Sequence, residues 1–410
     1  MTPAPLRPSS AFVVACALAV GAACTPRITA VDVGKPLGNA DLALAFSKGE
    51  SADADDFSEQ LVMRAVMEDE ASIYVKLTVT NLASADGRAD LPVSATLPGG
   101  RKVQLKERRD RGEWTFAKDR FFAEVGEGTV ELGVGHARVV ARSDEFEIDF
   151  ELTTELPPLR PKGGLYDRGG RFYVTTIPIP RGAARARIRL LEPAEEEAPD
   201  EPDAAPEDEP APPEDTPAPP EDEAASLPEE LDLDGTGYAE HRASNVPPYD
   251  LARRWYSIVD IGEDATVFLS AFEQAEPEGA RRDPRAPPGP VQGFFYAAGD
   301  ARLILYEQEL DLRVRGWYPD DKTSYPIPEI VFVADPKHTG FEGVVVAGPL
   351  SERKDDLQSL KKLERVIVKK FMKPWTFRFD RARYLFRRQN PGEAMQEIRG
   401  AQRLQVQQLN

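Results

Sequence analysis

Glu240 and His241 are neighbouring residues whose side chains could together move a proton. His241 is one of only three histidines in the 410-residue chain, and imidazole is the side chain that titrates nearest to neutral pH. A carboxylic acid such as Glu240 can act as the matching general acid. Two roles remain open for His241. It either binds a ligand head group or exchanges a proton at the mouth between two domains, or it is a structural histidine that bridges them.

Four further residues with suitable side chains lie close to this pair in the sequence. Tyr238 and Tyr249 combine an apolar ring with a polar hydroxyl, which suits a pocket mouth or a domain interface. Arg254 is suited to a buried pair with a carboxylate across the domain interface. Trp255 begins an apolar run and serves either as core or as the wall of a pocket. We therefore predict a ligand-binding site formed by Tyr238, His241, Tyr249, Arg254 and Trp255.

Other chemistries find little support in the sequence. The three scattered histidines give no zinc-binding spacing, and both cysteines lie within the first 24 residues. The sequence contains no phosphate-binding Gly-rich loop and no nucleophile elbow. A Ser-His-Asp triad built from distant residues stays open, but we predict neither a metal nor a cofactor.

The first 24 residues have the features of an export signal. Arg7 supplies a positive charge, and residues 11–23 are a run of small and apolar residues that is too short to span a bilayer. Gly21-Ala22-Ala23-Cys24 resembles the bacterial lipobox, in which the cysteine is acylated and becomes the mature N-terminus. Thr25 follows it in place of the Asp that retains lipoproteins at the inner membrane, which favours the outer membrane.

These features predict a membrane-anchored protein of the cell envelope. We expect residues 1–23 to be a signal peptide, Cys24 to be lipidated and residues 24–50 to be a linker from the anchor. Secretion after cleavage at another site is the alternative.

The net charge of −19 is concentrated in one segment. Residues 192–230 contain 17 acidic residues and 11 prolines, with no basic and no aromatic residue. Such a composition buries too little apolar surface to fold, so we predict a long disordered acidic loop. Residues 352–388 hold 13 basic and 5 acidic residues. The total charge argues against a nucleic-acid partner, while the basic segment is either a solvated face or a contact for anionic lipid or for the acidic loop.

Alternation of apolar and polar residues predicts strands along most of the chain. Residues 73–80, 146–152 and 310–315 alternate with a period of two, as a half-buried strand does. The flanks of the acidic segment alternate as well, with basic residues at 185, 187 and 189 and acidic residues at 232 and 234. Opposite charges favour cross-strand pairing, so the segment is predicted to extend the tip of a hairpin. We expect a short helix at 355–364 and a helix or loose tail at 391–410.

The segment from Gly235 to Trp255 resembles the centre of the double-lipocalin superfamily. The match consists of Gly-x-Gly-Tyr at 235–238, acid-His at 240–241, Pro248, and Arg-Trp at 254–255. This superfamily includes carotenoid 1,2-hydratases, tocopherol-cyclase-like proteins, AttH-like proteins and the survival-factor proteins of fungi, of which the last look most similar. The resemblance implies two lipocalin-like antiparallel β-barrels in tandem that handle long apolar molecules.

We therefore predict an all-β fold with few short helices. The N-terminal lipocalin-like domain is expected at 51–240, with 192–230 as its insert, and the C-terminal domain at 241–390.

Three functions are compatible with these residues. The first is a membrane-anchored lipoprotein that binds or carries a hydrophobic molecule, a lipid or an isoprenoid, near the domain junction. The second is a hydratase or cyclase that acts on an isoprenoid with Glu240 and His241, although Ala243 stands where the hydratase branch has a tryptophan. The third is a structural envelope protein without a ligand. An interior cavity favours the first two, and a barrel filled with side chains favours the third. The oligomeric state is left open.

Overall fold

The structure is a computed structural model that describes most of the chain outside its N-terminus. The described residues are 37–48, 56–81, 86–161, 165–168, 171–191, 229–274, 291–307, 310–323, 325–334, 340–357, 374–389, 392 and 394–409. The predicted signal peptide, Cys24 and nearly all of the acidic segment lie outside them, as does most of the helix predicted at 355–364. Within the described residues the helical segments are α2 (Asn39–Leu42), η1 (Ala45–Lys48), η2 (Pro98–Gly100) and α3 (Pro248–Leu251).

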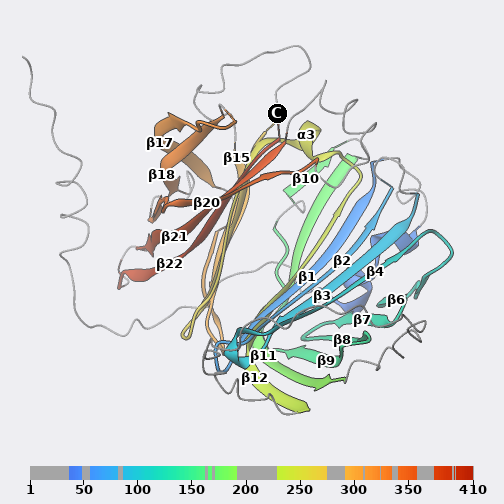
Figure 1. Cartoon of the computed structure of the whole chain (residues 1–410). Helices are drawn as coiled ribbons and strands as arrows, with labels where there is room; N and C mark the ends of the chain where they lie inside the picture. Colours follow the sequence, from blue (N-terminus) through green and yellow to red (C-terminus); the bar gives the residue numbers. More distant parts are fainter. Residues whose placement is uncertain are drawn as a thin grey trace, which may run out of the picture.

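The first sheet is antiparallel and contains twelve described strands (Figure 1). Their order is β4-β3-β2-β1-β12-β11-β9-β8-β7-β6-β5, and β10 pairs with β11 beside this path. The strands are β1 (Ser58–Met67), β2 (Ser72–Thr80), β3 (Arg88–Thr96), β4 (Lys102–Arg109), β5 (Thr115–Phe116), β6 (Phe121–Val125), β7 (Gly128–Gly133), β8 (His136–Arg142), β9 (Phe146–Thr153), β10 (Leu165–Arg168), β11 (Arg171–Leu190) and β12 (Glu230–Ser244).

The second sheet is antiparallel and contains ten described strands. Their order is β16-β15-β14-β13-β22-β21-β19-β18-β17, with β20 paired to β21. The strands are β13 (Ala252–Ile261), β14 (Thr266–Gln274), β15 (Val291–Ala298), β16 (Leu303–Glu307), β17 (Asp311–Pro319), β18 (Pro326–Ala334), β19 (Phe341–Val346), β20 (Leu350–Asp355), β21 (Trp375–Arg388) and β22 (Gln396–Gln408).

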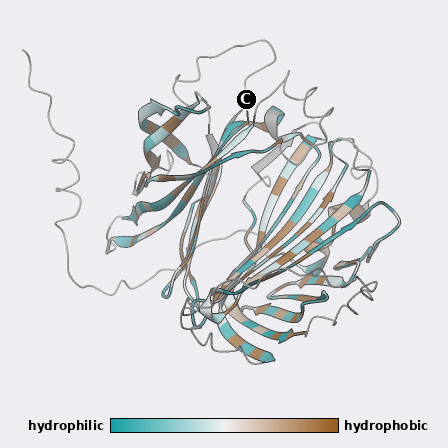
Figure 2. Cartoon of the chain, viewed as in Figure 1, coloured by the Kyte–Doolittle hydropathy of each residue, from teal (hydrophilic) through white to brown (hydrophobic). Residues whose placement is uncertain are grey.

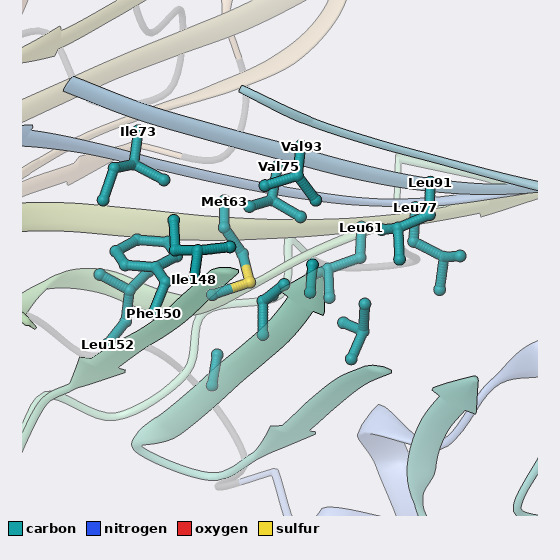
Figure 3. Packing of buried hydrophobic residues seen from close by; sticks show 14 of the residues in the cluster. Leu61, Met63, Ile73, Val75, Leu77, Leu91, Val93, Ile148, Phe150 and Leu152 are labelled. Atoms are coloured by element: carbon teal, nitrogen blue, oxygen red, sulfur yellow. The ribbon is translucent and has the colours of Figure 1, made fainter. Parts of the chain in front are cut away.

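Each sheet curls around a core of its own. In the first, β3 and β4 contact β6 across the interior, and in the second β15 contacts β17. Figure 3 shows Ile148 and Phe150 of β9 facing Met63 and Val75 of the opposite strands. The alternation of apolar and polar residues visible along the strands in Figure 2 is what places one face of each strand in a core.

A third apolar cluster lies between the two sheets and joins them. It takes Tyr173 and Tyr238 from the first sheet and Trp255, Phe268 and Tyr296 from the second, all of them buried. The two sheets thus pack through their outer faces while their inner faces enclose separate cores.

The predicted fold class is confirmed. The regular secondary structure of the described chain is almost all β-strand, and its two curled antiparallel sheets follow one another in the sequence as expected for two lipocalin-like units. The predicted hairpin around the acidic segment is confirmed too, because β11 pairs with β12 in antiparallel register. Arg187 Nε lies 3.0 Å from Asp232 Oδ1, so the opposite charges of the two strands do meet.

The linker predicted at 24–50 is corrected in its second half. Residues 37–48 fold against the first sheet, and they bury Leu42, Leu44 and Phe46 in its core. These apolar residues stand at alternate positions, so one side of an irregular segment can fill the opening of the curled sheet. The segment is therefore part of the first unit and not a spacer.

The C-terminal helix or tail predicted at 391–410 is wrong. Residues 396–408 form β22, which lies between β13 and β21 near the middle of the second sheet. Hydrogen bonding to a strand on each side outweighs the helix propensity of a glutamine-rich sequence. The boundary predicted after residue 240 also moves, since β12 continues in the first sheet to Ser244.

Candidate functional site

β12 presents Glu240 and His241 to opposite sides of the first sheet. Successive side chains of a strand alternate between its faces. His241 faces the inner core, where its ring meets that of Phe121 edge-on at 5.2 Å between centroids. Glu240 faces the second sheet and binds Arg242, with 2.5 Å from Nε to Oε1. The two side chains therefore do not form the acid–base pair that their adjacency in the sequence suggested.

His241 binds a different carboxylate, that of Glu59 on β1. The distance from His241 Nε2 to Glu59 Oε1 is 2.6 Å, and Glu59 is only 1% exposed. The same carboxylate accepts the backbone N–H groups of Ala45 and Phe46 at 2.8 and 2.9 Å. His241 thus does not bridge the two sheets, and it lies inside the first one. Together with Glu59 it fastens the segment 37–48 to the inner face of the first sheet.

Gly235 and Gly237, the two glycines before Tyr238, are required by the close packing of β12 against β1. A Cβ atom on Gly235 would lie 2.3 Å from the carbonyl oxygen of Val66, and one on Gly237 would lie 2.5 Å from that of Arg64. Real Cβ atoms do not approach so closely, so β12 can lie this near β1 only with glycine at both positions. The Gly-x-Gly part of the distinctive segment therefore shapes the strand pair rather than a ligand site.

Arg254 lies in the second core and is fully buried. Its Nη1 atom is 3.3 Å from both carboxylate oxygens of Glu273, and its Nε donates to Gln408 Oε1 at 2.8 Å. The guanidinium also stacks over the ring of Trp317, at 4.4 Å from the centroid. Arg254 therefore binds a carboxylate, as predicted, but within its own sheet and not across the interface.

Tyr256 completes this cluster. Its hydroxyl donates to Glu273 Oε1 at 2.6 Å. Burial, together with the nearby carboxylate, raises the pKa of Tyr256 well above its ordinary value, so the phenol stays protonated and remains a donor. The cluster is internally satisfied and has the character of a structural clamp.

Tyr238 and Trp255 lie between the two sheets. Trp255 packs edge-on against Tyr173 at 5.1 Å between centroids, and its Nε1 donates to Ser270 Oγ at 2.9 Å. Polar contacts close the same interface at its far end, where the buried guanidinium of Arg181 binds Asp300 at 2.6 Å and the carbonyl oxygen of Gly262 at 2.8 Å. The interface is thus fixed by aromatic packing and by a buried arginine.

A cluster of cations borders the aromatic residues on the outer face of the first sheet. Lys76 of β2 stands opposite Val62 of β1, which stands opposite Glu240 of β12. Arg242 lies on the same face, with its guanidinium 5.7 Å from the Trp255 ring centroid. Arg64 and, from the second sheet, Lys354 also act electrostatically on Lys76.

These cations are not fully compensated by nearby carboxylates. The pKa of Lys76 is lowered to about 8, mainly by burial and then by Arg242 and Lys354, while Asp90 opposes them. Glu240 is already bound to Arg242. The face therefore favours an additional negative charge.

Two buried hydroxyl groups lie next to this cluster. Thr175 of β11 stands opposite Arg242, and Tyr173 is two residues before it on the same face. The two hydroxyls interact with each other, but within the described residues neither Tyr173 Oη nor Thr175 Oγ1 has any other hydrogen-bond partner. Burial raises the pKa of Tyr173 to about 12, so its hydroxyl stays protonated. Buried polar groups normally have well-formed hydrogen bonds, and the weakly satisfied hydroxyls of Tyr173 and Thr175 are therefore candidates for contact with a bound molecule.

The residues predicted as one site are divided among three places. His241 lies in the first core, Arg254 lies in the second, and Tyr238 and Trp255 lie between the sheets. Tyr249 belongs to α3, and its side chain lies outside the described part of the structure. We define the inter-sheet face as Arg64, Lys76, Tyr173, Thr175, Tyr238, Glu240, Arg242, Trp255 and Lys354. The alternation of side chains along β12 is enough to predict that Tyr238, Glu240 and Arg242 share one side. The residues from β1, β2, β11 and β20 join them through the pairing of strands, which the sequence alone does not give.

Other kinds of site find little support in the described part of the chain. It contains no group of three or more metal-ligating side chains arranged around one point, and none of its helices has the length and apolarity needed to cross a membrane. Two grooves on the first unit have volumes of about 470 and 590 Å³. The first is lined by paired charges of β8, β9, β11 and β12, and the second is lined mainly by polar residues and reaches Asp300.

Comparison with known proteins gives similarity of structure alone. No protein-family model matches the chain, and no curated protein matches it in sequence. A putative AttH protein from Nitrosomonas europaea is similar over 92% of this chain and 99% of its own, with 11% identity and a TM-score of 0.47. CghA, solved with Sch210972, is similar over 93% and 96% of the two chains, with 8% identity and a TM-score of 0.49. Kievitone hydratase from Nectria haematococca is similar over 93% and 97%, with 8% identity and a TM-score of 0.43.

Proposed function

We propose that the protein binds an amphipathic molecule, a lipid or an isoprenoid with an anionic head group, at the inter-sheet face. One observation carries this proposal. The buried hydroxyls of Tyr173 and Thr175 have no hydrogen-bond partner beyond each other within the described residues, and they lie beside a cluster of cations that nearby carboxylates compensate only in part. Two donors and a positive field together suit a carboxylate or phosphate group.

The aromatic residues of the same face suit the apolar part of such a molecule. Trp255 contacts both Arg242, whose guanidinium is 5.7 Å from the ring centroid, and Tyr173, at 5.1 Å between ring centroids. A ligand held there has its head group near Lys76 and Arg242 and its apolar chain along the rings. Pockets for apolar ligands commonly combine such walls with a few placed polar groups.

Binding is tested with fluorescent fatty-acid probes that differ only in the head group. We expect a carboxylate probe to bind more tightly than the corresponding alcohol, and the Lys76→Met variant to lose that preference by about tenfold. Lys322→Met removes an exposed lysine from a turn of the second unit and serves as the matched control. Equal affinity for the two probes in the unaltered protein would contradict the proposal.

The ligand itself is sought by purifying the protein from its own membranes and extracting bound lipid for mass spectrometry. Recovery of one class of acidic lipid, depleted in Lys76→Met, supports the proposal. Protein that carries no lipid after gentle extraction favours the alternative of a structural envelope protein.

We also propose that the protein is held in the envelope as a lipoprotein acylated at Cys24. The supporting features are the apolar run at 11–23 and the small residues before the cysteine. Labelling with radioactive palmitate should mark the protein, and Cys24→Ser should abolish the label. Unchanged labelling of that variant would show that the acyl group is attached elsewhere, and no labelling of the unaltered protein would show that it is absent.

The geometry does not favour a hydratase or cyclase that uses Glu240 and His241 together. That mechanism needs Glu240 and His241 on one substrate, but the two side chains face opposite sides of β12. Each of them already has a partner, Arg242 and Glu59 respectively.

A further inference from the structure

The outer face of the second sheet carries a second distinctive arrangement, away from the inter-sheet face. Two rows of residues cross β17, β18, β19 and β21, each residue paired in register with the next. The first row is Arg315–Ile330–Val346–Arg383. The second row is Arg313–Phe332–Val344–Leu385–Arg399, and its last residue lies on β22. Each row therefore has apolar residues in the middle and an arginine at both ends.

These rows face away from the second core. The residues that alternate with them, such as Leu312, Val331, Val345 and Phe386, are the ones buried in that core. Side chains on either side of a core residue point to the opposite face of the sheet. Accordingly, the five apolar residues of the rows are only partly buried and belong to none of the apolar clusters of the described residues. We call these two rows the arginine-rimmed face.

The arginines at its rim are only partly neutralised. Arg313 binds Asp311 at 3.1 Å, and Arg399 lies 4.0 Å from Glu397. A further arginine of the same face, Arg387, binds Glu342. Arg315 has a contact with the ring of Phe332 at 5.1 Å, and within the described residues neither Arg315 nor Arg383 has a carboxylate within ion-pair distance. The face thus has an uncompensated positive charge at each end of its first row.

We propose that the arginine-rimmed face contacts the surface of an anionic lipid bilayer. Long basic side chains can reach sideways to phosphate groups while the apolar residues between them enter the boundary of the acyl region. Basic residues near an anionic membrane surface each contribute to attraction, and apolar contact adds to it. A protein partner would have to offer both an apolar strip and two acidic groups at the spacing of Arg315 and Arg383, whereas a bilayer meets this requirement at any position.

Binding to vesicles tests this proposal in the full chain. All variants carry Cys24→Ser, so that no acyl chain contributes to binding. Vesicles of phosphatidylcholine with one part in four of phosphatidylglycerol should bind the protein at low salt, and pure phosphatidylcholine should bind it more weakly. The double variant Arg315→Glu/Arg383→Glu should lower the partition coefficient by at least about tenfold.

A matched control separates this face from total charge. Arg101→Glu/Lys102→Glu makes the same charge change at two exposed residues where β4 begins, and neither has an ion-pair partner in the described chain. An equal loss in both double variants would overturn the proposal, because total charge would then explain binding. Failure of the unaltered chain to bind the anionic vesicles would overturn it as well and would leave a protein partner for this face.

A second measurement reports whether the apolar row enters the membrane. Both native cysteines lie in the first 24 residues, so replacing them with serine allows single labelling. A polarity-sensitive dye on Val344→Cys should shift to shorter wavelength with anionic vesicles, while the same dye on Val140→Cys of β8, which is 40% exposed, should not shift. The converse result, or a shift at both positions, would exclude this orientation.

Discussion

The two sheets each bury a carboxylate that binds a cationic or basic partner, but they use it differently. In the first sheet Glu59 meets His241 and also the backbone of Ala45 and Phe46, which belong to a segment outside the sheet. In the second, Glu273 meets Arg254 and Tyr256, which lie on a strand of the sheet itself. The first pair fastens an added segment, and the second fixes neighbouring strands to each other.

The chemistry of the partners follows this difference. Arginine stays charged at every accessible pH, so the pair of Arg254 and Glu273 persists in the core. Glu59 instead binds one imidazole and two backbone N–H groups, so its contacts join the sheet to the backbone of another segment. The comparison predicts that the second cluster contributes more to stability, while the first controls one local segment.

The largest expected effect comes from Arg254→Met. This change leaves Glu273 as a buried charge without its cation, and breaking a buried pair in this way typically costs about 3–5 kcal/mol of unfolding free energy. Urea denaturation measures the loss. Arg187→Met breaks exposed pairs with Glu230 and Asp232 and should cost far less, because water screens exposed charges. Similar losses in the two variants would contradict the prediction that the buried pair of Arg254 and Glu273 contributes more to stability than an exposed pair.

A smaller and more local effect is expected from Glu59→Ala. The variant leaves the N–H groups of Ala45 and Phe46 and the ring of His241 without their acceptor, which should cost about 2 kcal/mol. Hydrogen exchange at Ala45 and Phe46 should accelerate, while exchange in β13 and β22 stays unchanged. Acceleration spread evenly over both sheets would show that the segment is not a separate attachment.

Tyr256→Phe is a smaller change to the second cluster than Arg254→Met. The variant removes only the hydroxyl that donates to Glu273, while Arg254 keeps the carboxylate paired. We expect a loss of about 1–1.5 kcal/mol in urea denaturation, well below that of Arg254→Met. Tyr318→Phe alters an exposed tyrosine of the same unit and should be neutral. A loss as large as that of Arg254→Met would mean that the hydroxyl, and not the cation, holds the carboxylate.

The smallest effect concerns Lys76, which belongs to neither buried pair. Its pKa is about 8 in the folded chain, against 10.5 for an ordinary lysine, so the unfolded chain binds more protons between these values. Stability should therefore rise with pH across that window. The rise should be smaller in Lys76→Met by about 1 kcal/mol, after allowance for solvent screening. Denaturation at about pH 7 and about pH 10 gives the difference, and parallel curves for the two proteins would contradict it.

Much of the fold could be predicted from local pattern. Alternation in 73–80 and 146–152 corresponds to β2 and β9, and the charges beside the acidic segment predicted the β11–β12 hairpin. β22 was not predicted as a strand, because its sequence is rich in glutamine and few of its residues, Leu404 and Val406, face the core. The role of a strand that is bonded on both sides is decided by its neighbours, which local pattern does not record.

The candidate site was less accessible from the sequence. Arg254 and His241 were identified as unusual residues, but Glu59 is 182 positions from His241 along the chain. Only the pairing of β1 with β12 makes them neighbours. The separation of Glu240 from His241 followed directly from strand alternation, since adjacent residues of a strand face opposite sides. Lys76 and Thr175 could not be selected, because they become special only through Arg242 and the second sheet.

Both sheets join their first strand to their last, β1 to β12 and β13 to β22. The contact of Arg254 with Gln408 spans 154 positions, and that of Glu59 with His241 spans 182. Contacts so distant in the chain form slowly, because the entropy of closing a long loop is lost before they can form. Most of each unit must therefore emerge from a ribosome or a translocation channel before its first and last strands can pair. Folding of each half is then a late event, and a chain that stops before β22 leaves the second core open.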